Sequence, residues 1–160
     1  MTQNTNLAEK LGLLLKQHHL TITAAESCTG GLFLSTLTDI SGSSAYVIGG
    51  VVTYSNEAKQ KLINVQESTL TAYGAVSEQT AKEMATGVKA LFETDYAVSI
   101  TGIAGPGGGT AEKPVGLVYI GIATPNDVQA YRYVWGGTRI ENKQSSVEEA
   151  INLLIKIVGD

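Results

Sequence analysis

The sequence contains one cysteine and two histidines, and only 16% of its 160 residues are charged. A single cysteine excludes an internal disulfide and a cysteine-based metal cluster. No apolar run approaches the roughly 20 residues that a bilayer-spanning helix needs. The opening stretch, MTQNTNLAEK, lacks the basic-then-apolar pattern of a signal peptide. We therefore expect a cytoplasmic protein with no metal ion, no cofactor and no membrane partner.

Charge of either sign is sparse as well. The chain carries 11 basic and 15 acidic side chains, which gives a net charge of −4. An acidic chain gains no electrostatic attraction to nucleic acid, so we expect no nucleic-acid partner. With 43% hydrophobic residues, the chain is too apolar to remain disordered. Its length is that of one domain, which we expect to cover residues 1–160, with residues 1–5 mobile.

The order of helical and extended patterns predicts how this domain is built. Apolar residues recur at helical spacing in four long segments, and Ser55 or Asn56 can cap a further short helix. The long predicted helices cover residues 6–20, 32–40, 78–93 and 140–158. Compact apolar runs predict strands over residues 21–25, 47–54, 95–101, 115–123 and 128–135. We expect an α/β fold, a three-layer α/β/α sandwich with a mixed, mostly parallel sheet of about five to six strands.

For two of these helices the sequence also predicts a capping residue or a buried face. Asn6 is expected to cap the first helix, with Glu9 as its capping-box partner. Helix 78–93 is expected to bury an apolar stripe made of Ala81, Met84, Ala85, Val88 and Leu91.

Glycine is abundant where proline is scarce, with 18 glycines against 3 prolines. Glycine outside repeats marks tight backbone, because it adopts positive φ without strain. The glycines concentrate at 30–31, 49–50 and 102–109. These three places are where we look for function, and the first and third follow predicted strands.

Ser27 is the first candidate nucleophile. It follows a predicted strand and precedes two glycines and a helix, a placement that exposes its hydroxyl at the carboxyl edge of a sheet. The same placement directs backbone N–H groups at developing negative charge. Serine needs a base to become a nucleophile. The two histidines, His18 and His19, both lie on the first predicted helix, which disfavours a Ser-His-Asp triad.

Lys59 is the alternative base. It lies in the first turns of a predicted helix, where the positive end of the dipole favours the neutral amine. Tyr54 ends the preceding strand and can hydrogen-bond to either group and relay a proton. Spacing alone favours the simpler interpretation, in which Ser27 caps a helix and Lys59 is solvated. Cys28 competes as nucleophile, but no histidine partners it.

A glycine-rich segment, TGIAGPGGG at 101–109, follows a predicted buried strand. Its free N–H groups suit the binding of phosphate or carboxylate, although a purely structural loop is an equal alternative. No Gly-Lys-Ser/Thr follows, as a P-loop requires, and no helix follows directly, as a dinucleotide fingerprint requires. Arg139 and Lys143 are candidate anion partners, with ordinary surface charge as the alternative.

Five ordered segments of the chain resemble the CinA C-terminal domain family. They are AESCTGG at 25–31, VTYSNEAK at 52–59, GAVS at 74–77, TGIAGPGG at 101–108 and EKPVG at 112–116. The resemblance extends over about residues 7–156 and points to the stand-alone PncC type. Members of this family that act as enzymes are nicotinamide-nucleotide amidohydrolases, and the family fold is again a three-layer sandwich.

The resemblance implies deamidation of nicotinamide mononucleotide to nicotinic acid mononucleotide and ammonia, a salvage step of the pyridine nucleotide cycle. It also implies a serine–lysine acyl-enzyme mechanism, with Ser27 as nucleophile, Lys59 as base and Tyr54 assisting. N–H groups near Thr29–Gly31 would hold the oxyanion. Together with the glycine loop and the late basic motif, the expected substrate-binding residues are Thr29, Gly30, Gly31, Thr101, Gly102, Gly105 and Arg139.

The late basic motif departs from the family pattern. That pattern often reads Gly-Asp-Arg followed by a second arginine, whereas this chain has Gly137-Thr138-Arg139 and then Lys143. Lysine cannot supply a bidentate fork to phosphate, so Lys143 is expected to bind it less well than arginine would.

Two alternatives to the nucleotide deamidase stay open. The domain could be a catalytically silent module that binds a nucleotide or regulates competence or the response to DNA damage. It could also hydrolyse a different small amide, since a serine–lysine pair does not select the substrate. A homodimer is expected on base rates alone.

Overall fold

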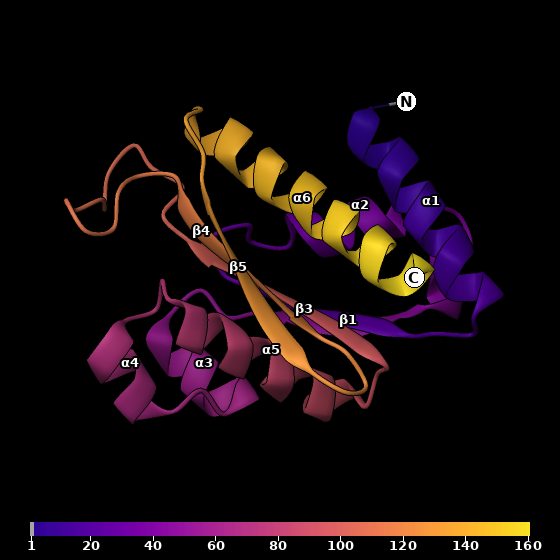
Figure 1. Cartoon of the computed structure of the whole chain (residues 1–160), viewed down its shortest axis with the longest axis horizontal. Coiled ribbons are helices and arrows are strands. Elements are labelled where there is room, and N and C mark those ends of the chain that lie inside the picture. The colour runs from indigo at the N-terminus through magenta and orange to yellow at the C-terminus, as the bar shows by residue number, and fades with distance from the viewer. Residues whose placement is uncertain (1) are drawn as a thin grey trace.

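The computed structural model describes residues 2–160, and Figure 1 shows how their helices and strands are arranged. In chain order the elements are α1 (Gln3–Gln17), β1 (Ile22–Glu26), α2 (Leu32–Thr38), the 3-10 turn η1 (Ser43–Ala45), β2 (Val47–Val52), α3 (Asn56–Ile63), α4 (Glu67–Tyr73), α5 (Glu78–Phe92), β3 (Tyr96–Gly102), β4 (Leu117–Ala123), β5 (Val128–Val134) and α6 (Arg139–Gly159). Every predicted helix and strand is present, with ends that shift by a few residues. The expected α/β architecture is confirmed.

The five strands form one mixed sheet in the order β2-β1-β3-β4-β5. β1 pairs with β2 and β3 in parallel, whereas β3 with β4 and β4 with β5 are antiparallel. Two of the four strand pairings are thus parallel and two are antiparallel, so the expectation of a mostly parallel sheet is wrong. The reason is that no helix connects β3 to β4, so β4 returns directly alongside β3.

Helices cover both faces of the sheet and make the three layers. α1, α2 and α6 pack together on one face, and α3, α4 and α5 lie on the other (Figure 1). All five residues of β1 are buried, as expected for a strand covered on both sides. The predicted nucleophile directly follows this fully buried strand.

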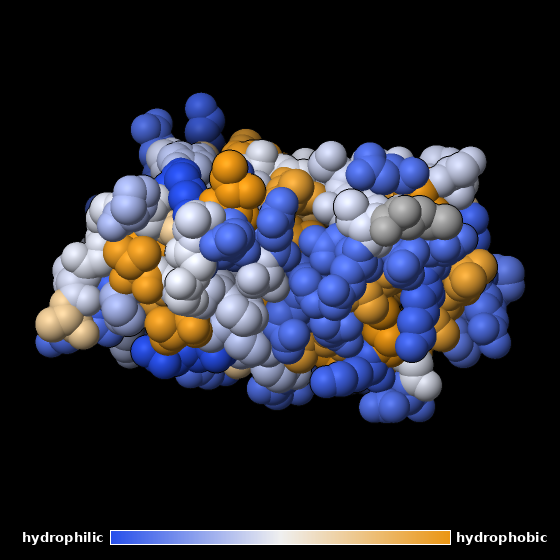
Figure 2. All heavy atoms as spheres, turned by 90° about the horizontal axis from the view of Figure 1, so that it is seen from above, coloured by the Kyte–Doolittle hydropathy of each residue, from blue (hydrophilic) through white to orange (hydrophobic). Residues whose placement is uncertain are grey.

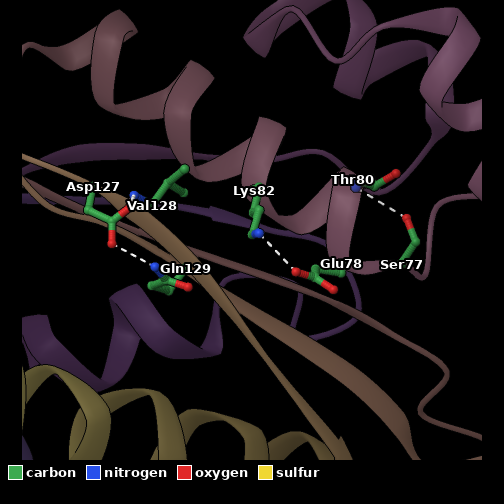
Figure 3. A network of polar contacts seen from close by, with 7 residues as sticks. All are labelled: Ser77, Glu78, Thr80, Lys82, Asp127, Val128 and Gln129. Carbon is green, nitrogen blue, oxygen red and sulfur yellow. Dashed lines mark hydrogen bonds and ion pairs between the residues drawn. The ribbon is translucent and has the colours of Figure 1, made fainter.

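Helix ends follow local capping chemistry, with one correction. α1 begins at Gln3, and Thr2 accepts a hydrogen bond from the Thr5 N–H, so Asn6 is not the cap. Residues 3–5 of the segment expected to be mobile are thus part of the helix, while residue 1 lies outside the described residues. At α5, the Ser77 hydroxyl accepts from the Thr80 N–H at 3.1 Å, as Figure 3 shows.

On the α5 side of the sheet, one expected core residue is exposed and one helix was not predicted. Leu91 is exposed, and the neighbouring Phe92 packs against the apolar cluster in its place. α4 was not predicted because none of its residues is buried, so its sequence carries no apolar period. An exposed ion pair between Glu78 and Lys82, 2.8 Å long, lies on α5 (Figure 3).

The surface on the side of α1 and α6 is mostly hydrophilic, with small separate hydrophobic areas (Figure 2). None of the helices within residues 2–160 combines the length and the apolar character that crossing a membrane requires.

Candidate active site

A cavity of about 280 Å³ opens at the carboxyl ends of β1 and β3. Polar side chains from four parts of the chain reach it, and the glycine-rich segment after β3 forms one wall. Its lining residues are Ser27, Cys28, Tyr54, Asn56, Lys59, Ala75, Val76, Thr101, Gly102, Ile103, Ala104, Gly105, Gly107, Gly108 and Arg139. A larger hollow of about 710 Å³ lies at the opposite end of β3, between α5 and the β4–β5 turn. Among the described residues that line this hollow, no lysine bonds to a hydroxyl, in contrast to the smaller cavity.

Ser27 is fixed at the end of β1 by its backbone. Its N–H donates to the Ile100 carbonyl at 2.9 Å, and its carbonyl accepts from the Gly30 N–H at 3.1 Å. Gly30 and Gly31 have φ values of +61° and +106°, which other residues adopt only with strain. These two glycines therefore let the chain turn sharply from β1 into α2. The Ser27 side chain is 8% exposed and faces the cavity.

Lys59 reaches the same point from α3. The Ser55 hydroxyl caps this helix by accepting from the Ala58 N–H at 3.1 Å, as predicted for Ser55 or Asn56. The Lys59 side chain is only 1% exposed. Its Nζ lies 3.1 Å from Ser27 Oγ and donates to the Thr53 carbonyl at 2.8 Å. The structure thus brings the two residues, both with little solvent exposure, into direct hydrogen-bond contact.

Burial sets the proton affinities around this pair. It lowers the pKa of Lys59 because an ammonium loses its hydration there, and the smaller influence of Cys28 acts in the opposite direction. Burial, assisted by the nearby Glu26 carboxylate, raises the pKa of the Cys28 thiol to about 12. A thiol with such a pKa stays protonated at neutral pH and is a poor nucleophile. The electrostatics therefore favour Ser27 over Cys28 as the attacking group.

Tyr54 and Arg139 lie at the mouth of the cavity. The Tyr54 side chain is 63% exposed, and its hydroxyl accepts a hydrogen bond from Arg139 Nη2 at 3.2 Å. Arg139 begins α6 and donates through Nη1 to the Gly105 carbonyl at 2.8 Å. Tyr54 bonds to neither Ser27 nor Lys59 in this structure, unlike the relay expected from the sequence.

The glycine-rich wall is held from two sides. Thr101, predicted to bind substrate, lines the cavity and donates its hydroxyl to the Ala75 carbonyl at 2.8 Å. Asn142 on α6 donates to the Ala104 carbonyl at 3.0 Å and accepts from the Gly137 N–H at 3.0 Å. Sequence reasoning missed Asn142, although an asparagine among the buried positions of a helix is a signal that could have found it.

The segment Thr29–Gly31, expected to bind the substrate, instead holds the turn between β1 and α2. None of its three residues lines the cavity, and the Thr29 hydroxyl donates to Glu26 Oε1 at 2.6 Å. The N–H groups of Phe33 and Leu34 also donate to the Glu26 carboxylate. The start of α2 is thus already occupied by an anion of the chain itself. Sequence reasoning missed this use of Glu26, and nothing in the spacing alone signals it.

Among residues 2–160, no group of three or more histidine, cysteine, aspartate or glutamate side chains is placed to hold a metal ion. Lys143 Nζ lies 3.9 Å from the position that a Cβ on Gly30 would occupy, so this lysine reaches the turn that follows the nucleophile.

Comparison with known proteins adds to this geometry. The sequence profile of the CinA C-terminal domain matches residues 4–158. The chain belongs to the CinA C-terminal domain family. It is 52% identical over 151 residues to a CinA-like protein of Endomicrobium trichonymphae, which covers 94% of this chain and 35% of that protein. It is 49% identical over 153 residues to a putative competence-damage inducible protein of Moorella thermoacetica, covering 96% of this chain and 37% of that one.

Solved structures of CinA proteins resemble the fold over its full length. The competence/damage inducible protein CihA of Agrobacterium tumefaciens superposes with a TM-score of 0.96 at 42% identity, over 100% of this chain and 98% of that one. The competence damage-inducible protein A of Klebsiella pneumoniae gives a TM-score of 0.96 at 30% identity, over 99% and 98%. By contrast, this CinA domain spans little more than a third of the length of the curated relatives above.

Proposed function

We propose that this CinA domain is an amidohydrolase that deamidates nicotinamide mononucleotide to nicotinic acid mononucleotide and ammonia. The observation that carries the proposal is the 3.1 Å hydrogen bond between Lys59 Nζ and Ser27 Oγ at the wall of a cavity. Family membership and the resemblance of the site motifs support the same activity. We assign the reaction to pyridine nucleotide salvage in the cytoplasm.

The contacts of Lys59 support the following assignment of roles. In the structure Lys59 Nζ donates to the Thr53 carbonyl at 2.8 Å and to Ser27 Oγ at 3.1 Å. In the reactive state the amine is neutral: it keeps the N–H bond to Thr53, and its lone pair takes the place of the N–H that faces the Ser27 hydroxyl. Lys59 takes the hydroxyl proton as Ser27 Oγ attacks the carboxamide carbon. The Lys59 ammonium then returns this proton to the leaving nitrogen, and ammonia departs. Water hydrolyses the acyl-enzyme with the same lysine as base, so Ser27, Lys59 and water supply every proton and bond.

The cavity lining suits an anionic substrate with a flat, partly apolar end. It contains Arg139 and Lys59 but no acidic side chain, while Lys143 approaches from α6. Arg139 is the group that can offer a fork to a phosphate. Val76 and Ile103 provide apolar surface for a pyridine ring. Although the net charge of the chain is negative, the Arg139 guanidinium faces the cavity with no acidic side chain in the lining to oppose it, so a phosphate monoester would be attracted there.

One of the N–H groups first expected to hold the oxyanion, that of Gly30, already has a partner, and so does the start of α2. The Gly30 N–H is engaged with the Ser27 carbonyl, and α2 presents its first N–H groups to Glu26. We assign the main role to the N–H of Cys28, which follows the nucleophile directly on the cavity wall. Tyr54 would assist only after its hydroxyl leaves Arg139, which its exposed position allows.

The test is a release assay for ammonia with product analysis on four amides: nicotinamide mononucleotide, nicotinamide riboside, nicotinamide and glutamine. The proposal expects turnover of the mononucleotide above the other three and its loss in Ser27→Ala. Equal or faster turnover of another amide would reassign the substrate and keep the chemistry. Binding of the mononucleotide without turnover would instead favour the catalytically silent regulatory module. Relatives named competence-damage inducible proteins are the reason to keep this alternative.

A further inference from the structure

Glu26 is the last residue of β1 and precedes Ser27 directly, yet its side chain does not line the cavity. It is 0% exposed. Three groups donate to its carboxylate: the Thr29 hydroxyl at 2.6 Å and the Phe33 N–H at 2.9 Å to Oε1, and the Leu34 N–H at 3.1 Å to Oε2. The carboxylate therefore ties the end of β1 to the turn and to the start of α2.

A buried carboxylate is costly unless hydrogen bonds and positive potential compensate for its lost hydration. No cationic side chain among the described residues forms an ion pair with Glu26. The three donors, two of them at the positive end of α2, supply the compensation. Because the carboxylate accepts from all three donors at once, it restrains the conformation of the segment 27–31 that lies between them.

The backbone of Glu26 supports the other member of the pair. Its carbonyl accepts the Thr53 N–H at 2.8 Å, and the Thr53 carbonyl accepts from Lys59 Nζ at 2.8 Å. The Glu26 side chain thus holds the turn that follows the nucleophile, and its backbone holds Thr53, whose carbonyl binds the base.

We infer that Glu26 is a positioning residue: its carboxylate holds the Ser27 turn in the geometry in which Oγ meets Lys59 Nζ. The inference rests on the proposed function, since it concerns the same serine–lysine pair. It also explains why a substrate anion would not use the start of α2, which the Glu26 carboxylate already fills.

Glu26→Gln tests the inference with little change in shape. The amide oxygen can still accept from Thr29 and Phe33, but the NH₂ group faces the Leu34 N–H, so the turn must move. We expect kcat to fall about 100-fold, as for a misplaced reacting group, with KM changed less than about twofold. Thr29→Val removes one donor at nearly constant volume and should lower kcat about tenfold. Thr29→Ser keeps the hydroxyl, so its kcat should stay close to that of the wild type.

The matched control is Ser99→Ala on β3. Ser99 is also fully buried and donates to the Ala81 carbonyl at 2.6 Å, but it does not line the cavity. Its loss should lower Tm and leave kcat unchanged at a temperature well below Tm. Thr29→Val keeps the test decisive if Glu26→Gln does not fold.

A second readout separates this inference from the choice of substrate. A fluorophosphonate probe labels an activated serine, and intact mass gives the labelling rate of Ser27 without any amide. Slower labelling in Glu26→Gln and Thr29→Val, parallel to kcat, supports the inference, and it does so even if nicotinamide mononucleotide is not turned over. Wild-type kcat and labelling in both variants, or an equal loss in Ser99→Ala, overturns it. A wild-type protein that neither labels nor releases ammonia overturns both proposals.

Discussion

The two sides of the cavity differ in how firmly they are built. Ser27 and Lys59 are buried, bonded to each other and held by β1 and α3. Tyr54 and Arg139 are exposed at the mouth and bonded to each other and to a glycine-rich loop. The buried side can shift a pKa because water is excluded, whereas the exposed side can rearrange when a ligand arrives. We interpret the first as the chemical half of the site and the second as the recognition half.

Removing either member of the buried pair should have the largest effect. In Ser27→Ala or Lys59→Met we expect kcat to fall by about 10³-fold or more, because nucleophile and base act as one unit. For the same reason the double variant should be no slower than the single variants. Ammonia release at saturating mononucleotide measures this, with circular dichroism to show that the fold persists. A loss of only a few-fold would contradict the division into two halves.

The second prediction concerns pH and uses the buried half alone. Only the neutral Lys59 amine can accept the proton, so kcat/KM should rise with pH through the lowered pKa of Lys59 and reach a plateau below the roughly 10.4 of free lysine. The unfolded chain binds this proton more tightly than the folded one. Stability should therefore also rise with pH between the folded and unfolded pKa of Lys59.

Lys59→Met provides the control for the pH prediction. Methionine fills similar volume without a titrating group, so this part of the pH dependence of the unfolding free energy should disappear in denaturant titrations. An unchanged slope in the variant would show that Lys59 keeps an ordinary pKa.

The recognition half should respond through affinity. Arg139→Lys removes the fork and its bonds at the mouth, and we expect KM for the mononucleotide to rise about tenfold, equivalent to about 1.4 kcal/mol, with a smaller change in kcat. Nicotinamide riboside lacks the phosphate and is the matched substrate, so its kcat/KM should change little. An equal loss for both substrates would move Arg139 from recognition to the chemical half.

The same division describes how much the sequence could predict. Apolar periodicity located the helices and strands that carry the core, and the glycine turn after β1 identified Ser27 from local pattern. The predicted start of a helix identified Lys59 as a candidate base, because the helix dipole there favours the neutral amine and can be inferred from local sequence. Motif resemblance then connected the two residues, whose spacing along the chain has no signature of its own.

What stayed hidden depends on contacts between distant segments. Arg139 bonding to Tyr54 and Asn142 bonding to Ala104 join parts of the chain that no local pattern relates. Glu26 turned to α2 because burial on both faces of β1 leaves its carboxylate no water, and only the folded turn offers the three donors. The strand β4 was predicted, but its antiparallel pairing with β3 was not, because the direction of pairing depends on how the intervening loop folds back.

The smallest expected effect concerns Lys143, which belongs to α6, the helix that Arg139 begins, and whose Nζ lies near the turn that follows Ser27. An ammonium binds phosphate through a point charge, whereas a guanidinium presents two parallel N–H groups. We therefore expect Lys143→Arg to lower KM for the mononucleotide by about threefold, equivalent to about 0.6 kcal/mol, with kcat unchanged. Lys156→Arg, on the exposed last turn of the same helix, is the control and should change neither constant. If Lys143→Arg lowers kcat instead, Lys143 acts on the turn that follows Ser27 and belongs to the chemical half of the site.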